Sequence, residues 1–206
     1  MSDPFLHLTS DPRLHGTLAF LAEADRMKSI VRQTFLVDGS RQETDAEHSW
    51  ELALMVMAFA GFAPGGVDPA RAMRMVVIHD LVEIDAGDSY AYDASANAAR
   101  VAREMRAAER IFGLLPAETG AELRALWLEF EARETPDARF ARALDRLQPL
   151  LHAWHTGGRM WQRRGVRPEQ VREGMAVIAE GIPALADLVG ALIADAEAQG
   201  FFGPAG

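Results

Sequence analysis

The sequence predicts an all-α protein that folds as a single domain over residues 1–206. Nearly every segment places its apolar residues at helical rather than alternating intervals. Runs of β-branched and aromatic residues bounded by turns, which are typical of strands, are missing. A chain of 206 residues is close to the size of one domain, and no long linker divides it. We therefore expect a helical bundle around one core.

Turn-forming residues separate the predicted helices from one another. They are Pro64-Gly65-Gly66, Gly87, Gly113, Pro116, Pro136, Gly157-Gly158, Pro168 and Gly181-Ile182-Pro183. Thr44 and Glu47 have the spacing of a capping box, so one helix is expected to begin at Thr44. The predicted helices cover about residues 15–34, 44–62, 68–86, 93–113, 116–132, 136–156, 168–180 and 183–199, with boundaries good to ~2–4 residues.

Composition excludes several classes of function. A formal net charge of −9 argues against nonspecific nucleic-acid binding, which needs clustered Lys and Arg, but leaves a small phosphate ester possible. The absence of cysteine excludes disulfides and thiolate metal sites. The start, Met1-Ser2-Asp3-Pro4-Phe5, lacks the features of a signal peptide, and no run approaches the ~20 apolar residues of a membrane span. We expect a cytoplasmic protein with no membrane segment.

The doublet His79-Asp80 is the most informative feature, because it interrupts the apolar run Val76-Val77-Ile78 and Leu81-Val82. An ionised carboxylate in an apolar stripe costs several kcal/mol unless it is paired or bound to a cation. The two side chains differ by only ~100° around a helix, so both can approach one ion. The doublet therefore predicts half of a metal site.

His48 and Asp145 are the candidates that complete this site. His48 shares a helix face with Leu52, Met55, Val56 and Phe59, which places its imidazole on the inward stripe. Asp145 lies at the edge of the apolar stripe of the predicted helix 136–156. Any one of these residues alone is better explained as a hydrogen-bonded core histidine or a paired aspartate, whereas all four together favour a metal centre.

The ligands His48, His79, Asp80 and Asp145 form a mixed nitrogen and oxygen set. Such a set suits one divalent Mn, Co, Fe, Ni or Zn ion and leaves coordination positions for water and a substrate oxygen. Open positions imply catalysis.

These residues resemble the H…HD…D signature of the HD-domain metal-dependent phosphohydrolases. The segments His79–Asp88, Ala46–Ser49 and Lys28–Arg32 are similar to the bacterial 5'-deoxynucleotidase branch. The resemblance covers about residues 15–155, and the predicted C-terminal helices within 168–199 carry no such motif. It implies an HD-type helical bundle, a homodimer and, since no histidine lies between Asp80 and Asp145, a single metal ion.

The resemblance also implies roles around the metal. Glu83 shares the face of His79 and Asp80 one turn later, where a base or proton relay is needed. The segment Asp88-Ser89-Tyr90-Ala91 is implied to hold the substrate, together with Asp80 and Asp145. The alternative interpretations are a helix-face glutamate paired with an arginine and an ordinary Asx turn. Asp85 is expected to be solvated or to cap a helix.

Arg32, in the predicted helix 15–34, corresponds to an arginine that orients the phosphate in that branch. Tryptophan follows this arginine in the deoxynucleotidases, whereas this chain has Gln33, which could hydrogen-bond a ribose 2'-hydroxyl. His152 and His155 are predicted to be helix-surface or interface residues. The tryptophans are predicted to be packing residues, with Trp50 nearest the site; they are Trp50, Trp127, Trp154 and Trp161.

The leading hypothesis is a metal-dependent hydrolase of (deoxy)nucleoside 5'-monophosphates in which Glu83, Asp88 and Arg32 assist the chemistry. Two alternatives stay open. One is an HD hydrolase of another phosphate ester, such as a nucleoside triphosphate, a sugar phosphate or an alarmone. The other is a non-catalytic nucleotide-sensing module in which the metal is structural.

Overall fold

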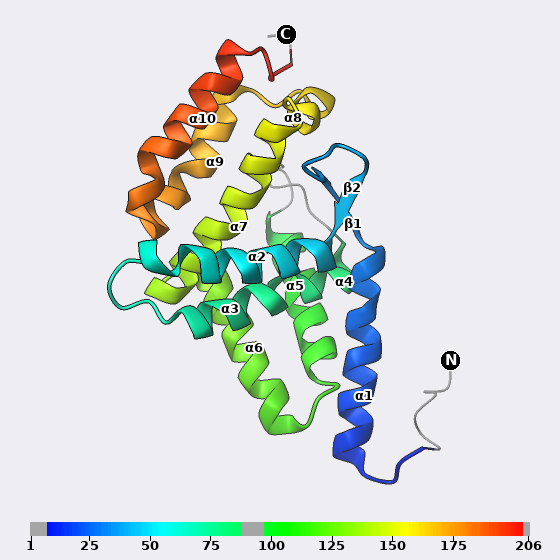
Figure 1. The fold of residues 1–206 in the computed structure, drawn as a ribbon. Coiled ribbons are helices and arrows are strands. Elements are labelled where there is room, and N and C mark those ends of the chain that lie inside the picture. The colour runs from blue at the N-terminus through cyan, green and yellow to red at the C-terminus, as the bar shows by residue number, and fades with distance from the viewer. Residues whose placement is uncertain (1–7, 88–96, 204–206) are drawn as a thin grey trace.

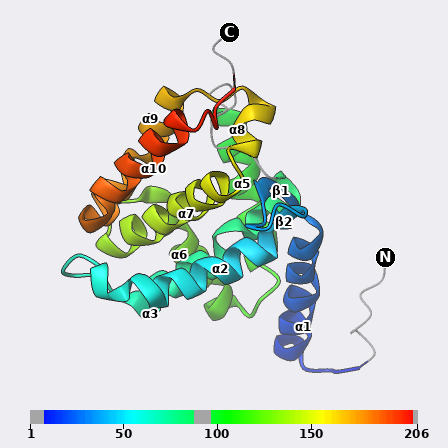
Figure 2. The same cartoon turned by 45° about the horizontal axis from the view of Figure 1, so that its top comes forward.

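The computed structural model describes residues 8–87 and 97–203 and confirms the all-α class (Figures 1 and 2). The helices of the first half are α1 Pro12–Ala24, η1 Asp25–Ser29, α2 Asp45–Phe59, η2 Ala60–Phe62, α3 Pro69–Ile78, η3 His79–Val82 and α4 Glu83–Ala86. Those of the second half are α5 Asn97–Phe112, α6 Ala117–Ala132, α7 Pro136–His155, α8 Arg159–Arg164, α9 Pro168–Gly181, η4 Pro183–Leu185 and α10 Ala186–Ala198. The strands β1 Val31–Phe35 and β2 Gln42–Thr44 form a small antiparallel hairpin.

Helix α7 lies at the centre of the bundle and contacts α2, α3, α6 and α9. The pair α2 and α3 crosses one side of it, while α9 packs along it with α10 on the outer side of α9 (Figure 1). The hairpin and α8 sit at one end of α7 (Figure 2). The predicted C-terminal helices are thus packed onto the motif-bearing part of the chain, and a single domain over 1–206 stays a prediction.

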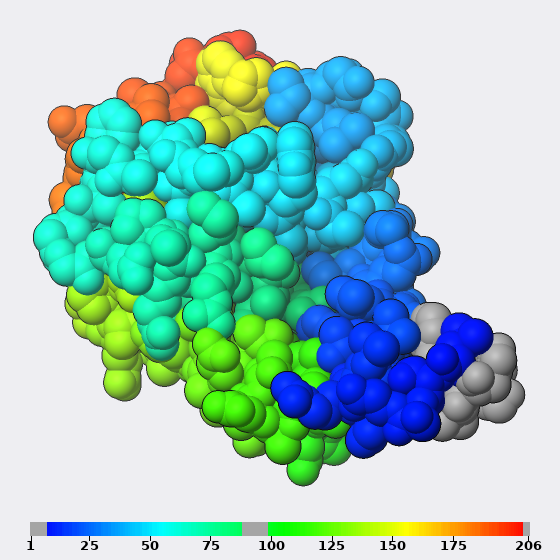
Figure 3. Space-filling view, turned by 60° about the horizontal axis from the view of Figure 1, so that its bottom comes forward, coloured from blue at the N-terminus to red at the C-terminus, as the bar shows by residue number. Residues whose placement is uncertain are grey.

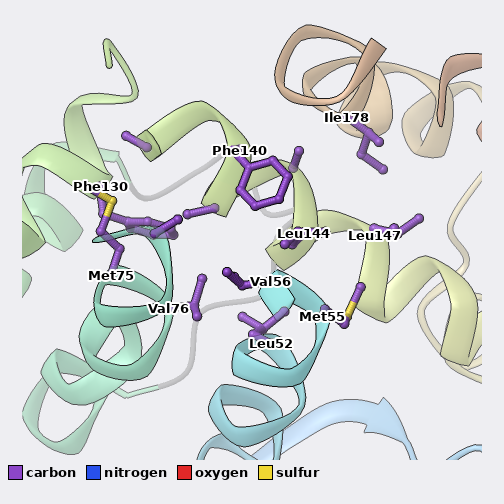
Figure 4. Packing of buried hydrophobic residues seen from close by; sticks show 14 of the residues in the cluster. Leu52, Met55, Val56, Met75, Val76, Phe130, Phe140, Leu144, Leu147 and Ile178 are labelled. Carbon is purple, nitrogen blue, oxygen red and sulfur yellow. The ribbon is translucent and has the colours of Figure 1, made fainter. Parts of the chain in front are cut away.

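Figure 4 shows the side chains that fill the space between α2, α3, α6, α7 and α9. On α2, Leu52 and Val56 are one turn apart and fully buried, as the helical spacing predicts. Burying a side chain of this size stabilises the fold by about 1.5–3 kcal/mol. Their neighbours in the core include Met75, Val76, Phe130, Phe140, Leu144, Leu147 and Ile178.

The predicted capping box at the start of α2 is confirmed. The backbone N–H of Glu47 donates to Thr44 Oγ1 at 3.3 Å, and the backbone N–H of Thr44 donates to Glu47 Oε2 at 2.9 Å. These bonds satisfy donors that a helix start leaves unpaired. They fix where α2 begins and hence where His48 faces.

The prediction of a helix through residue 34 and of a chain without strands is wrong. The helical segment ends at Ser29, and Val31–Phe35 pairs as a strand with Gln42–Thr44. The turn between the strands uses Gly39 at φ 68°, a conformation that glycine adopts without strain. The backbone N–H of Leu36 donates to the carbonyl of Arg41 at 2.9 Å and closes the hairpin.

Two smaller departures concern the segment after His79 and the tryptophans. The predicted helix 68–86 tightens into a 3₁₀ segment over His79–Val82, where Trp127 Nε1 donates to the carbonyl of His79 at 3.2 Å. Trp127 and Trp161 are buried as predicted, but Trp50 is 66% exposed, so its predicted packing role is wrong.

The short helix α8, Arg159–Arg164, was not predicted. Among the described residues, no helix is both long and apolar enough to cross a bilayer. The cytoplasmic location stays a prediction.

Candidate metal centre and phosphate site

The structure brings the four predicted ligand residues together in the interior. His48 lies in the first turn of α2, His79 and Asp80 open η3, and Asp145 lies midway along α7. Their exposed fractions are 0%, 3%, 8% and 5%. One ligand atom from each of His48, His79 and Asp145 lies within 4.8 Å of the others. Three elements distant in the sequence therefore converge on one point.

The His79 ring is held by its own helix. Its Nδ1 lies 2.8 Å from the carbonyl oxygen of Val76, which can only accept, so Nδ1 carries the proton and donates it. Nε2 then faces Asp80 Oδ1 at 3.1 Å and Asp145 Oδ1 at 3.4 Å, buried and without a hydrogen bond of good geometry. Burial opposes protonation of the ring, but the Asp80 and Asp145 carboxylates outweigh it and raise the pKa of His79 to about 10.

Each aspartate divides its two oxygens between the imidazoles and an arginine. Asp145 Oδ1 lies 3.1 Å from His48 Nε2, while Asp145 Oδ2 accepts from Arg142 Nη1 at 3.0 Å. Asp80 Oδ1 faces His79, while Asp80 Oδ2 accepts from Arg32 Nη1 at 2.7 Å. Asp80 Oδ2 is also 3.9 Å from His48 Nε2. Each carboxylate is thus held in place by an arginine of its own.

This arrangement fits a divalent cation. A buried imidazole nitrogen without a good hydrogen bond and two carboxylate oxygens aimed at the same point are a costly set unless a proton or a cation lies between them. Two nitrogens and two oxygens are also the donor types that first-row divalent ions accept. The residues present can therefore hold one such ion.

Arg32 reaches the cluster from strand β1, so its predicted position in a long helix is wrong, although its predicted place beside the site is correct. Its Nη1 lies 3.2 Å from Asp45 Oδ1, and its Nε lies 3.4 Å from Glu43 Oε1. Burial favours the neutral form, but the surrounding carboxylates, Asp80 foremost, raise the pKa of the guanidinium further above its usual value. Arg32 stays charged within a ring of acids.

Glu83 lies beside the cluster, as its spacing predicts. One carboxylate oxygen from each of Glu83, Asp80 and Asp45 lies within 4.8 Å of the others. Asp85 instead pairs with Arg110 at the surface, with Arg110 Nη2 donating to Asp85 Oδ1 at 2.9 Å.

The predicted substrate segment Asp88-Ser89-Tyr90-Ala91 lies outside the described residues. Gln33 is described, and its Oε1 accepts from Arg164 Nε at 3.2 Å and from Arg164 Nη2 at 2.6 Å. The amide oxygen of Gln33 is thus already engaged by α8.

The sequence did not identify three side chains that contact the cluster or its neighbours. Arg142 and Gln148 lie three residues before and after Asp145, and His152 lies seven after it, so all share its face of α7. That helical spacing was the available signal. His152 is 4% exposed and its Nδ1 donates to the carbonyl of Phe35 at 2.9 Å, so its predicted surface position is wrong. His155 is exposed, as predicted.

Comparison with known proteins assigns the chain to a family. Residues 24–186 match the HD domain family, and this span contains all four candidate ligands. The chain is an HD-domain protein. This HD-domain protein is 28% identical over 143 residues to human 5'-deoxynucleotidase HDDC2, covering 68% of this chain and 69% of the relative. It is 27% identical over 141 residues to the HDDC2 of Danio rerio, with 68% and 69% covered.

Two solved structures share the fold of this chain. A crystal structure of a predicted metal-dependent phosphohydrolase from Magnetospirillum magnetotacticum MS-1 is 46% identical, with a TM-score of 0.89 over 94% of this HD-domain protein and 100% of that chain. The PH0347 protein of Pyrococcus horikoshii OT3 shares the fold at 20% identity, with a TM-score of 0.62 over 85% of this chain and 99% of that one.

Proposed function

We propose that this HD-domain protein is a metal-dependent phosphohydrolase that removes the 5'-phosphate from nucleoside or deoxynucleoside 5'-monophosphates. The observation that carries the proposal is the buried cluster of two imidazoles and two carboxylates, held between Arg32 and Arg142. The 5'-deoxynucleotidase relatives support the same substrate class. A purely structural ion would have no need of a further carboxylate such as Glu83 beside it.

His48, His79, Asp80 and Asp145 would hold one divalent ion, with Mn, Co, Fe, Ni and Zn as candidates. When bound, such an ion supplies Lewis acidity toward a phosphoryl oxygen and lowers the pKa of water. The remaining roles belong to side chains of this chain.

Arg32 would neutralise charge that develops on the phosphoryl oxygens, and its contact with Asp80 supports this role. Glu83 would exchange a proton with the attacking water or with the leaving 5'-oxygen, and its position within a few ångströms of Asp80 supports this role. We assign the positioning of the nucleoside to Asp88, Ser89, Tyr90 and Ala91 on the strength of the resemblance alone. Asp80 and Asp145 complete the substrate contacts.

Gln33 bears on the choice of sugar. Its Oε1 is engaged by Arg164, which leaves the amide Nε2 as the group able to meet a sugar. An N–H donor can hydrogen-bond the oxygen of a 2'-hydroxyl, whereas an apolar wall could not. We therefore expect AMP to be hydrolysed alongside dAMP.

Phosphate release from dAMP and AMP tests the proposal. The protein is stripped with a chelator and reconstituted separately with Mn, Co and Zn. We expect release that depends on the metal, and an Asp80→Ala protein that loses both metal and turnover while Arg41→Ala keeps both. No release with any metal would overturn the nucleotidase assignment. Turnover of nucleoside triphosphates, sugar phosphates or alarmones would then identify another hydrolase, and tight nucleotide binding without product would identify a sensing module.

We also propose that the protein is a homodimer joined through the outer face of α2. The outer face of this helix carries an exposed apolar row: Trp50, Leu54 and Met57, at i, i+4 and i+7, are 66%, 42% and 55% exposed. An exposed apolar row of this kind is typical of a surface that another protein covers. Figure 3 shows α2 in cyan along the same broad face as α3 and α1. A cavity of about 590 Å³ beside Trp50 extends this surface toward the hairpin.

Light scattering on a sizing column tests the dimer. We expect a dimer for the wild-type protein and a monomer for Leu54→Glu. Val101→Glu, at an equally uncovered residue on α5 that is 55% exposed, is the matched control and should leave the dimer intact. A monomeric wild-type protein at micromolar concentration would contradict the proposal.

A further inference from the structure

We infer that Gln148 is a positioning residue that sets which nitrogen of His48 carries the proton, and so keeps the Nε2 lone pair directed at the metal site. The inference rests on the proposed role of His48 as a ligand. Gln148 lies on α7 and is 1% exposed. Its carboxamide lies between His48 on one side and two glutamates on the other.

The orientation of the Gln148 amide follows from its neighbours. Its Nε2 lies 2.8 Å from Glu43 Oε2 and 2.8 Å from Glu51 Oε2, and an ionised carboxylate can only accept. If the amide were flipped, its oxygen would face two carboxylate oxygens at hydrogen-bond distance, which is repulsive. The NH₂ group must therefore face the glutamates, and Oε1 must face His48.

The protonation of His48 follows in turn. Gln148 Oε1 lies 3.1 Å from His48 Nδ1, and an amide oxygen can only accept, so Nδ1 must carry a proton. In the neutral ring the lone pair is then on Nε2, which faces Asp145 Oδ1 at 3.1 Å. The carbonyl of Val76 likewise fixes a proton on Nδ1 of His79. The two imidazoles thus present matching Nε2 atoms to one point, each fixed by a different acceptor.

The two glutamates are themselves held by cations. Arg32 Nε lies 3.4 Å from Glu43 Oε1. His152 Nε2 lies 3.0 Å from Glu51 Oε2, while His152 Nδ1 donates to a backbone carbonyl. These contacts hold both carboxylates in place beside the amide. Loss of Gln148 would leave His48 Nδ1 facing carboxylates only, with Glu43 Oε1 at 3.9 Å.

Glu43, Glu51 and His152 could also be taken for a second metal site, since one ligand atom from each lies within 4.8 Å of the others. The Gln148 amide decides against this interpretation. Its NH₂ group donates to both carboxylates and its Nε2 lies 3.3 Å from His152 Nε2, so it occupies the space between them. We therefore infer that Glu43, Glu51 and His152 orient Gln148 and hold no ion of their own.

Nitrogen-15 NMR of the histidine rings tests the inference on the wild-type protein without substrate. His48 signals are assigned with a His48→Gln sample, and spectra are recorded without metal and with zinc. We expect a proton on His48 Nδ1 in both states. A ring that carries its proton on Nε2 alone, with a bare Nδ1, would overturn the inference whatever the enzymatic activity is.

Cobalt affinity, followed by visible absorption, tests the consequence. Removing the partner of a metal-bound histidine typically weakens binding about 10–100-fold, and we expect such a loss for Gln148→Met. Leu147→Val, one residue away and buried without polar contacts, is the matched control and should bind within about threefold of wild type. Unchanged affinity in Gln148→Met would contradict the inference. If the NMR and cobalt results are as expected but no phosphate is released, the proposed function is wrong and the inference about Gln148 stands.

Discussion

Removing the charge of Arg32 should destabilise the metal-free protein strongly. The Arg32 side chain is 14% exposed and lies 2.7, 3.2 and 3.4 Å from oxygens of Asp80, Asp45 and Glu43. At an effective dielectric constant of ~20, each contact is worth about 5 kcal/mol before desolvation is subtracted. Breaking a buried pair by removing one partner costs about 3–5 kcal/mol in measured cases, because the remaining charge stays buried. We expect a loss of this size for Arg32→Met at pH 7.

Urea unfolding followed by circular dichroism measures this loss. The matched control is Arg41→Met, which removes an exposed arginine from an exposed glutamate and should cost less than about 1 kcal/mol.

Burial raises the pKa of Asp80, but His79 and Arg32 hold it below its usual value. A depressed pKa stabilises the fold above the unfolded pKa and loses that effect as pH falls. The difference between wild type and Arg32→Met should therefore shrink below about pH 4. Equal free energies of unfolding for the wild type and Arg32→Met at pH 7 would refute the role of Arg32 as the counter-charge of these carboxylates.

Three further predictions follow from burial and charge. Glu83→Gln should keep the metal, measured by elemental analysis, and lose turnover by about 10²–10⁴-fold; undiminished turnover would exclude its proton-transfer role. Leu52→Ala should cost about 2–5 kcal/mol in urea unfolding because Leu52 is fully buried, whereas Val101→Ala, at an exposed residue of α5, should cost less than about 1 kcal/mol. Burial opposes protonation of His152, but Glu51 raises the pKa of its ring. The protonated ring therefore stabilises the fold fully below about pH 6.5, and this stabilisation is lost as pH rises through the raised pKa. In His152→Gln, the free energy of unfolding should therefore fall less above pH 6.5 than it does in the wild-type protein.

The sequence was sufficient for the parts of the fold that depend on local rules. Thr44 and Glu47 are three residues apart, so their capping box could be recognised and the start of α2 predicted. The candidate ligands His48, His79 and Asp145 could be predicted because each places a polar group among apolar residues at helical spacing. Such signals lie within a few residues of each other and need no knowledge of the tertiary structure.

The site-related errors come from one non-local feature, the hairpin. Strand β2 has only three residues, and β1 is a strand because it pairs with β2, so neither is evident from its own periodicity. Missing the hairpin misplaced Arg32 on a helix. It also misplaced His152, because the carbonyl of Phe35 that accepts from its buried ring belongs to β1. One omitted pairing thus accounts for both site-related errors.

The charges around the cluster explain why an acidic chain can serve as a phosphohydrolase. Five carboxylates lie in the cluster or next to it; they are Glu43, Asp45, Asp80, Glu83 and Asp145. Three arginines balance them in part; they are Arg32, Arg142 and Arg146. Five carboxylates and three arginines leave two negative charges in excess. One divalent ion would neutralise them, which agrees with a single metal. A phosphate dianion responds to charges within a Debye length of about 8–10 Å, so the formal net charge of −9 spread over the molecule does not prevent its approach. With its ion, the site would present a near-neutral interior with arginines at its edges, whereas without it the carboxylates would repel the same substrate.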